Sequence, residues 1–260
     1  MPKISAIIIT YNEEDSIGRC LDSIKDIADE IIVVDSFSTD RTREICKEYN
    51  VRFISHEFEG YRDQKNFALQ QATYQNILSL DADEALSDEL RASILAIKND
   101  DKWDYDGYKF NRRNYYCGTW IRFSEWYPDK QLRLFFADHG KFGELNLHEK
   151  FILSKGTKIG RLKGDLLHWA FLTREEHSKK MAKYAVIGAE EYHKAGRKAT
   201  IFTPYIHSAW GFFRTYFIRG GLLDGMNGLR ICSTYAGTAF RKYRMLYKLN
   251  KKGKSQPSKN

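Results

Sequence analysis

Cysteine is scarce in this chain of 260 residues, and its four copies lie far apart. Cys20, Cys46, Cys117 and Cys232 form no Cys-x-x-Cys pair, which is the spacing typical of structural zinc sites and of redox sites. The sequence therefore predicts four unpaired thiols and disfavours a cysteine-based metal or redox centre.

Long apolar runs are also lacking. No stretch approaches the ~18 consecutive apolar residues of a membrane-spanning helix. The N-terminus shows no charged segment followed by an apolar one, as a signal peptide would. Hydrophobic residues make up an ordinary 42% of the chain, whose length suits one large domain or a domain with an appendage. We therefore expect a cytoplasmic, globular protein.

Acidic residues are nearly absent from the last part of the chain. Residues 201–260 contain eleven Lys and Arg but a single acid, Asp224. Of the 42 basic and 34 acidic residues in the chain, 31 and 33 precede this segment and give a net charge of −2, although the whole chain carries +8. This asymmetry indicates a polyanionic partner for the C-terminal segment, either a nucleic acid or an acidic membrane surface.

Four short apolar runs dominate the first 90 residues: 4–9, 31–34, 51–54 and 77–80. Between the first two, apolar residues recur at helical spacing, which indicates a β-α-β unit. We predict an α/β fold with a mostly parallel central sheet. Ligands bind outside the carboxyl ends of the strands in such sheets. The polar residues that would lie there are Thr10, Asn12, Glu13 and Asp35.

The fourth run ends in Asp81-Ala82-Asp83-Glu84, where one small residue separates two carboxylates. A chain that turns out of a strand can bring such carboxylates together, and hard divalent cations prefer oxygen ligands. Asp-x-Asp is a common pattern and is weak evidence alone. The motif follows two strands of the kind found in nucleotide-binding sheets, and this position makes a metal site the favoured interpretation. No glycine-rich phosphate loop occurs nearby, which disfavours a dinucleotide site.

Four segments, taken in order, resemble family 2 glycosyltransferases: residues 6–14, 30–42, 65–69 and 80–84. This resemblance covers residues 3 to 90, with weaker likeness to about residue 250. Within the family, the chain resembles the lipopolysaccharide core β-1,4-glucosyltransferases. The resemblance implies a GT-A fold, in which a divalent metal (Mg or Mn) held by the Asp-x-Asp motif bridges the two phosphates of a nucleotide-sugar.

Site residues follow from this resemblance position by position. Thr10, Asn12, Glu13 and Asp35 would contact the base and ribose, and Lys65 would lie near the diphosphate. Within the Asp-x-Asp motif, Asp81 would belong to the donor site and Asp83 would be the more direct metal ligand.

Two further residues follow later in the chain. Glu149 matches the carboxylate that serves as general base in inverting GT-A enzymes, although this chain has His148-Glu149 where many relatives have Glu-Asp. His168, at the end of a predicted strand over 159–168, matches a late histidine that ligates the metal. His148 could take the same role, and a structural role for His168 stays open.

Residues 104–153 are rich in aromatic side chains, which could cover the apolar faces of a sugar or fill a core. After them, a Thr-Arg-Glu-Glu capping box at Thr173 begins a predicted amphipathic helix.

Beyond Pro204, aromatic residues alternate with Lys and Arg at helical spacing, interrupted by Gly220-Gly221. This combination is typical of an interfacial helix, with rings at the lipid headgroups and cations on anionic lipid. The alternative is a set of helices that pack on the catalytic domain and merely expose their cations. We predict a GT-A catalytic domain over 1–200, a helical membrane-associating extension over 201–250 and a disordered tail over 251–260.

The favoured function is a metal-dependent, inverting glycosyltransferase that moves a sugar, glucose first of all, from a UDP-sugar to a membrane-anchored, lipid-linked glycan such as the lipopolysaccharide inner core. It would work as a peripheral protein on the inner face of the cytoplasmic membrane. Two alternatives stay open. A nucleotidyltransferase usually carries a glycine-rich N-terminal loop, which residues 10–16 lack, and a nucleic-acid-binding protein would leave Asp35, Asp81 and Asp83 without a role.

Overall fold

The computed structural model describes residues 1–100, 103–145 and 148–254, without the side chains of residues 144, 145, 148, 149 and 252–254. Two units make up the chain. The sheet unit comprises Met1–Arg113 and Asp129–Trp169, and the helical unit comprises Asn114–Pro128 and Ala170–Asn260. The domain boundary expected from the sequence lies after residue 200. In the structure the helical unit begins after Trp169 and also includes the earlier loop 114–128.

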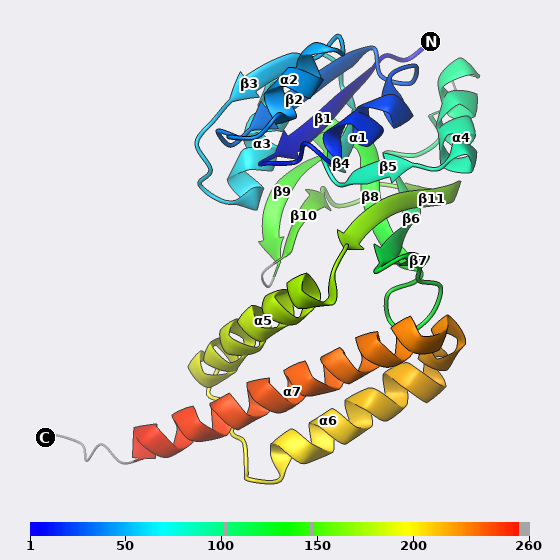
Figure 1. Ribbon diagram of the computed structural model, residues 1–260. Coiled ribbons are helices and arrows are strands. Elements are labelled where there is room, and N and C mark those ends of the chain that lie inside the picture. Colours follow the sequence, from blue (N-terminus) through cyan, green and yellow to red (C-terminus); the bar gives the residue numbers. More distant parts are fainter. Residues whose placement is uncertain (101–102, 146–147, 255–260) are drawn as a thin grey trace, which may run out of the picture. The chain divides into compact units, whose positions relative to one another are not determined.

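The sheet unit is built on one large sheet with the strand order β3-β2-β1-β4-β8-β6-β11-β5 (Figure 1). Its first four strands in this order are β3 (Arg52–Ser55), β2 (Glu30–Asp35), β1 (Ile4–Thr10) and β4 (Asn76–Asp81), and they pair in parallel. The others are β8 (Asp129–Phe136), β6 (Gly107–Tyr116), β11 (Ile159–Phe171) and β5 (Glu84–Leu86). The pairs β4–β8, β6–β8 and β11–β5 are antiparallel. The α/β fold expected from the sequence is confirmed.

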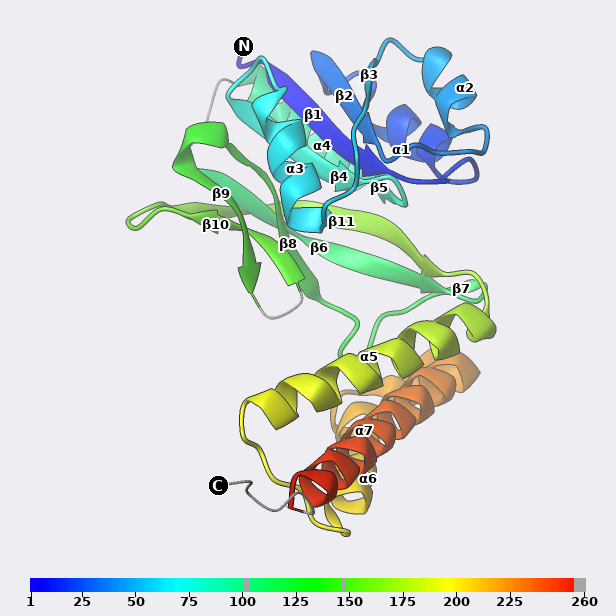
Figure 2. The same ribbon diagram turned by 90° about the vertical axis from the view of Figure 1, so that its left-hand side faces the viewer.

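Apolar side chains cover both faces of the parallel strands, as their continuous apolar runs predict. Ile4, Ala6 and Ile8 of β1 pack into a core with α1 (Ile17–Ile24), α2 (Thr42–Lys47) and α4 (Asp88–Asn99). Ile7, on the other face, packs with α3 (Tyr61–Gln70). Figure 2 shows α3 and α1 on opposite sides of β1. Burying one such side chain fully contributes about 1.5–3 kcal/mol, so the strand ends are held by a rigid core.

A separate hairpin covers the face on which α3 lies. It consists of β9 (Gly140–Leu145) and β10 (His148–Leu153), which follow the short helix η1 (Ala137–His139) and pair antiparallel. Phe142 and Phe151 face each other across the hairpin and pack on Phe135 of β8, with the Phe135 and Phe151 rings 3.6 Å apart. These rings fix the hairpin to the sheet.

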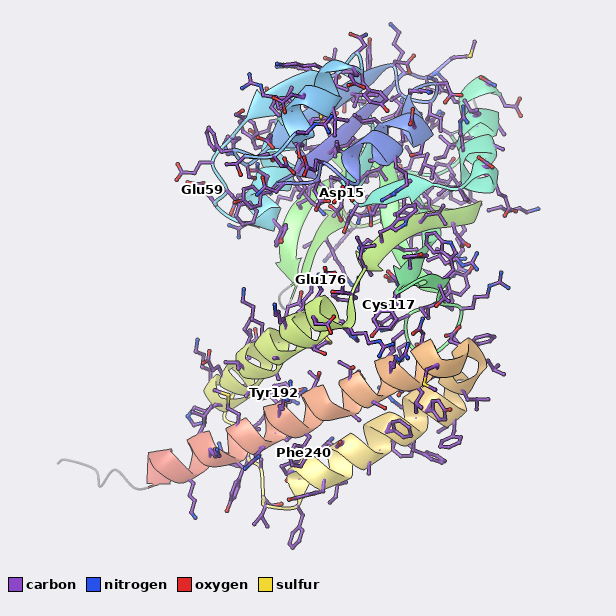
Figure 3. The ribbon with its side chains drawn as sticks, in the orientation of Figure 1. Asp15, Glu59, Cys117, Glu176, Tyr192 and Phe240 are labelled. Atoms are coloured by element: carbon purple, nitrogen blue, oxygen red, sulfur yellow. The ribbon has the colours of Figure 1, made fainter. Side chains whose placement is uncertain are left out.

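The helical unit consists of α5 (Arg174–Lys194), α6 (Thr203–Phe213), η2 (Arg214–Ile218), η3 (Gly221–Asp224) and α7 (Gly225–Lys254), with the small strand β7 (Thr119–Trp120). Both α5 and α6 pack along α7. The predicted capping box is confirmed, because Thr173 and Glu176 exchange side-chain and backbone hydrogen bonds; Figure 3 labels Glu176 near the start of α5. The interruption at Gly220-Gly221 is also present, and Gly220 adopts the left-handed conformation at φ 69°.

Two polar side chains, the buried Asn227 and the partly exposed Asp224, attach loop 114–128 to the helices. The Asn227 amide donates to the carbonyl oxygens of Tyr116 and Cys117 at 3.2 and 3.3 Å. The Asp224 carboxylate accepts from the backbone amides of Arg122 and Phe123, both at 3.0 Å. The loop therefore belongs to the helical unit.

Helix α7 continues to Lys254, four residues into the segment expected to be a disordered tail. Residues 255–260 lie outside the described residues. Within the described part of the chain, no helix is both long and apolar enough to span a membrane.

Candidate active site

The loops after β1 and β2 are joined by hydrogen bonds that hold the predicted nucleotide-binding residues. Asn12 has left-handed backbone geometry at φ 52°, and its side-chain oxygen accepts from the amide of Thr39 at 2.8 Å. The buried Asp35 carboxylate accepts from both the amide and the hydroxyl of Ser38. The Ser38 hydroxyl in turn accepts from the Asn12 amide at 2.8 Å. The structure thus brings Asn12 and Asp35 into one network at the carboxyl edge of the sheet.

Thr10 and Glu13 lie at the same edge. The Thr10 hydroxyl is buried and has no hydrogen-bond partner among the described residues, so a bound ligand would satisfy it. The amide of Glu13 donates to the Thr42 hydroxyl at 2.8 Å. Burial and the negative charge of Asp83 raise the pKa of Glu13 to about 7. The two carboxylates therefore create a negative field that a cation would relieve.

The Asp81 carboxylate forms ion pairs with two cationic side chains. Lys65 Nζ lies 2.8 Å from Asp81 Oδ1, and Arg133 Nη2 lies 2.8 Å from Asp81 Oδ2. Burial opposes ionisation of Asp81, but the charges of Arg133 and Lys65 outweigh it and hold the pKa of this carboxyl well below its usual range. Lys65 and Asp81, each predicted to belong to the donor site, therefore form an ion pair.

Arg133 also forms an ion pair with the buried Glu84 at 2.7 Å. Burial disfavours the charged form of Arg133, but the negative charges of Asp81 and Glu84 outweigh this effect and raise the pKa of Arg133. Neither Arg133 nor Glu84 was among the predicted site residues. The sequence feature that indicates such a pair is a single cation, Arg133, inside the apolar run 132–136, because a buried arginine requires a buried carboxylate.

Asp83 lies in a different environment. Its side chain is 32% exposed, and its Oδ2 atom lies 3.2 Å from Nε2 of His168, which is 16% exposed. Strand β11 delivers this histidine, pairing His168 with Glu84 in register, and the Trp169 amide donates to the Asp83 carbonyl at 3.1 Å. The two residues predicted to ligate a metal are thus in contact.

A carboxylate oxygen is a suitable ligand for Mg²⁺ or Mn²⁺, whereas an imidazole nitrogen suits a transition metal such as Mn²⁺ better than Mg²⁺. No group of three or more His, Cys, Asp or Glu that could hold a metal occurs among the described residues. Magnesium sites often use one or two carboxylates and complete their coordination with substrate phosphates and water. Asp83 and His168 fit this second kind of site, in which the substrate supplies the remaining ligands.

His148 and Glu149 lie at the start of β10, where only their backbone is described. Their side chains lie outside the described residues, so the general-base role of Glu149 and the alternative metal role of His148 stay predictions. Many of the aromatic residues of 104–153 are core residues; Tyr108, Phe110 and Phe135 are nearly inaccessible to solvent.

Comparison with known proteins identifies the family of the chain. The model of the family described as "Glycosyl transferase family 2" matches residues 5–152. The chain is 32% identical over 254 residues to the lipopolysaccharide core biosynthesis glycosyltransferase LpsC of Rhizobium meliloti, covering 92% of this chain and 91% of LpsC. It is 31% identical over 265 residues to an uncharacterized glycosyltransferase of Rickettsia typhi, covering 98% of this chain and 90% of that protein.

Among solved structures, S. aureus TarS 1-349 aligns with 96% of this chain and 92% of that chain, at a TM-score of 0.49 and 20% identity. The family match supports the GT-A form of the α/β fold that the sequence predicts. The family match covers more than half of the chain and includes the β1 and β2 loops, Lys65, the Asp-x-Asp motif and Arg133. The chain therefore belongs to glycosyltransferase family 2.

Proposed function

We propose that this enzyme transfers a hexose from a UDP-sugar, UDP-glucose first of all, to a lipid-linked glycan acceptor with inversion of configuration. The observation that carries the proposal is the contact between Asp83 and His168 beside the Asp81–Lys65–Arg133 cluster, at the carboxyl end of β4. LpsC, which is named for lipopolysaccharide core biosynthesis, supports a glycan acceptor of this kind. Family membership argues against the nucleotidyltransferase and nucleic-acid alternatives.

The residues of the site would divide the work. The network of Asn12 and Asp35, with the unsatisfied hydroxyl of Thr10, would bind the nucleoside. Asp83 and His168 would hold a divalent metal, which when bound neutralises charge on the leaving diphosphate. Lys65 is fixed by Asp81 and would add a second positive charge at this edge.

Transfer itself needs a base and a nucleophile. Glu149 would take the proton from an acceptor hydroxyl, and that oxygen would attack the anomeric carbon from the face opposite the diphosphate. The new C–O bond forms as the bond to the diphosphate oxygen breaks, so an α-linked donor gives a β-linked product.

A membrane-bound acceptor requires the enzyme at a membrane surface, and the helical unit supports this placement. Apolar side chains are exposed along α6, η2 and η3: Tyr205, Ile206, Trp210, Phe213, Phe217, Ile218, Leu222 and Leu223. Residues 199–213 contain no charged side chain if histidine is neutral, and basic residues dominate the segments on both sides. The only acid after residue 200, Asp224, is engaged by backbone amides. Peripheral attachment to the inner face of the cytoplasmic membrane is therefore part of the proposal.

The donor can be identified by thermal unfolding with a panel of nucleotide-sugars in Mn²⁺. A ligand at 100 times its dissociation constant adds about 2.7 kcal/mol of stability, so UDP-glucose should raise the melting temperature more than other UDP-sugars, and EDTA should remove the increase. Equal stabilisation by GDP- and CDP-sugars, or none by any nucleotide-sugar, would contradict the donor assignment.

A further inference from the structure

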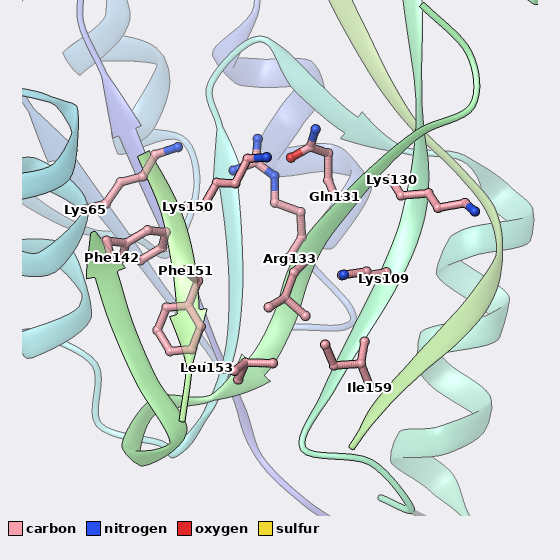
Figure 4. A pocket seen from close by; sticks show the side chains of 11 residues that line it. Lys65, Lys109, Lys130, Gln131, Arg133, Phe142, Lys150, Phe151, Leu153 and Ile159 are labelled. Atoms are coloured by element: carbon pink, nitrogen blue, oxygen red, sulfur yellow. The ribbon is translucent and has the colours of Figure 1, made fainter. Parts of the chain in front are cut away.

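The sheet unit contains a pocket of about 210 Å³ that shares Lys65 and Arg133 with the site described above (Figure 4). Side chains of β6, β8, β9, β10 and β11 line it, together with Lys65 of α3. None of its lining residues comes from β1, β2 or the loops after them, where the nucleoside-binding network lies. The pocket is therefore a separate part of the sheet unit.

Cationic side chains dominate the pocket. Five of its lining residues are Lys65, Lys109, Lys130, Arg133 and Lys150, and no acidic side chain occurs among the described lining residues. Lys65 and Arg133 are neutralised by Asp81 and Glu84. The other three lysines have no acidic partner among the side chains that the structure describes. A bound anion would be attracted by the charges of these lysines, and it would lower the repulsion between them.

The remaining walls are apolar. Phe142 and Phe151 form one side, and Leu132, Leu153 and Ile159 contribute aliphatic surface. Figure 4 shows the head groups of Lys65, Lys150 and Arg133 toward one end of the pocket and Leu153 and Ile159 toward the other. A ligand that combines a charged group with apolar C–H surface, as a phosphorylated or carboxylated sugar does, would match both ends.

The pocket adjoins the Asp-x-Asp motif. Lys65 and Arg133 line the pocket and each contacts Asp81, so a ligand in the pocket would lie next to the donor site. We propose that the pocket binds an anionic group, a phosphate or a carboxylate, on the acceptor glycan. This inference rests on the proposed function, because it names the chemical class of that enzyme's acceptor.

The test uses glucose 6-phosphate, glucuronate and glucose as probes for the full chain, with dissociation constants measured by calorimetry. The parent should bind both anionic sugars at least about tenfold more tightly than glucose. Lys109→Gln and Lys150→Gln should each weaken glucose 6-phosphate binding about tenfold, since losing one charge-assisted contact of about 1.4 kcal/mol costs a factor of ten. Lys130→Gln should have a smaller effect, because Figure 4 shows its amino group directed away from the other head groups.

Lys155→Gln is the matched control, since Lys155 is an exposed lysine in the turn before β11 and does not line the pocket. UDP affinity is measured on every variant. If Lys109→Gln and Lys150→Gln weaken UDP binding as much as glucose 6-phosphate binding, the lysines serve the donor diphosphate and the proposal is overturned. Equal affinity for glucose and glucose 6-phosphate would also overturn it.

Failure of the proposed function gives a different result. A parent protein that binds glucose 6-phosphate through Lys109 and Lys150 but binds no nucleotide-sugar would refute the glycosyl transfer and the acceptor assignment, while the preference of the pocket for anions would stand.

Discussion

The two units depart from the usual distribution of side chains in opposite directions. The sheet unit places charge inside: Glu84, Lys65 and Arg133 are all buried. The helical unit places apolar surface outside, with Ile206 64% and Trp210 55% exposed. Buried ion pairs contribute little net stability, and large exposed apolar patches mark interaction sites. Folding alone explains neither feature. The buried charges therefore indicate chemistry in the sheet unit, and the exposed apolar surface indicates an interaction surface on the helical unit.

The strongest test of this comparison concerns Asp83, whose carboxylate is exposed at a strand end. Asp83→Asn should lower kcat/KM for sugar transfer at least about 10³-fold, since a metal-centred charge interaction is worth several kcal/mol at about 1.36 kcal/mol per factor of ten. Its urea-unfolding free energy should change by less than about 0.5 kcal/mol. Asp104→Asn, at an exposed carboxylate outside the site, is the control. Transfer at the parent rate would refute the role of Asp83.

Arg133 should behave in the opposite manner, as a group on which folding depends. Arg133→Met leaves the buried Glu84 without its closest cation, and breaking such a pair costs about 3–5 kcal/mol. Urea unfolding should show this loss, and the double variant with Glu84→Gln should recover part of it. Arg112→Met, which removes a longer 3.4 Å contact to Glu84, should cost less. A loss below about 1 kcal/mol for Arg133→Met would show that Glu84 is compensated elsewhere.

Among the buried titratable groups of the helical unit, His177 can be compared with this cluster. Its ring lies 3.3 Å from the Tyr116 hydroxyl and packs against Trp126 and Phe171. Burial, and then the charge of Lys180, lower its pKa from 6.5 to about 4. The folded state therefore keeps His177 neutral while the unfolded chain takes up a proton below pH 6.5. Stability is full above that pH and falls as the pH drops from 6.5 to 4, by up to about 3 kcal/mol.

His177→Gln retains a polar group beside Tyr116 but cannot titrate. The difference in unfolding free energy between pH 7 and pH 4.5 should therefore be smaller in this variant than in the parent, by about 2 kcal/mol. His193→Gln is a control at a less buried histidine of the same helix. Identical pH profiles for parent and His177→Gln would show that His177 is not the group responsible.

Much of the sheet unit could be predicted from sequence because its signals are local. Apolar runs of four to six residues gave the parallel strands, and the polar residue after each run marked the edge where ligands bind. The contact between Asp83 and His168 was predicted only through resemblance, since 85 residues separate them. The ion pairs of Asp81 could not be predicted in full, because nothing local indicates that Arg133 rather than another cation reaches it.

The helical unit was predicted less well for a related reason. The amphipathic pattern of α5 shows that the helix has a partner, but does not identify the partner, and the boundary after residue 200 therefore differs from the one in the structure. In the same way, the aromatic spacing after Pro204 predicts helices without showing which rings stay exposed. The structure shows which apolar side chains of this region are buried and which are exposed. Leu246 of α7 is buried, while Trp210 and Phe213 of α6 are exposed.

The smallest expected effect is that of two ring substitutions on this exposed surface. Trp210→Gln with Phe213→Gln should reduce binding to phosphatidylcholine–phosphatidylglycerol vesicles about tenfold, and the loss should persist in 0.5 M salt, because ring insertion is not screened. Replacing Arg241, Arg244 and Lys248, three exposed cations of α7, with Gln should weaken binding at low salt only, at about 1 kcal/mol per cation. Lys242 is left unchanged because it lies over the Tyr192 and Tyr243 rings, at 4.4 and 5.0 Å.

Tyr184→Gln, at an exposed aromatic residue of α5 outside this surface, is the control for loss of a ring. The two sets of variants separate the contributions of rings and cations, which the sequence presented together. If the α7 substitutions abolish binding at all salt concentrations while the α6 substitutions change nothing, α6 does not insert and the attachment is purely electrostatic. If the parent prefers nucleic acid to anionic vesicles at physiological salt, the contrast between a catalytic sheet unit and a membrane-binding helical unit is wrong, since the exposed rings of α6 would then serve base stacking instead of lipid.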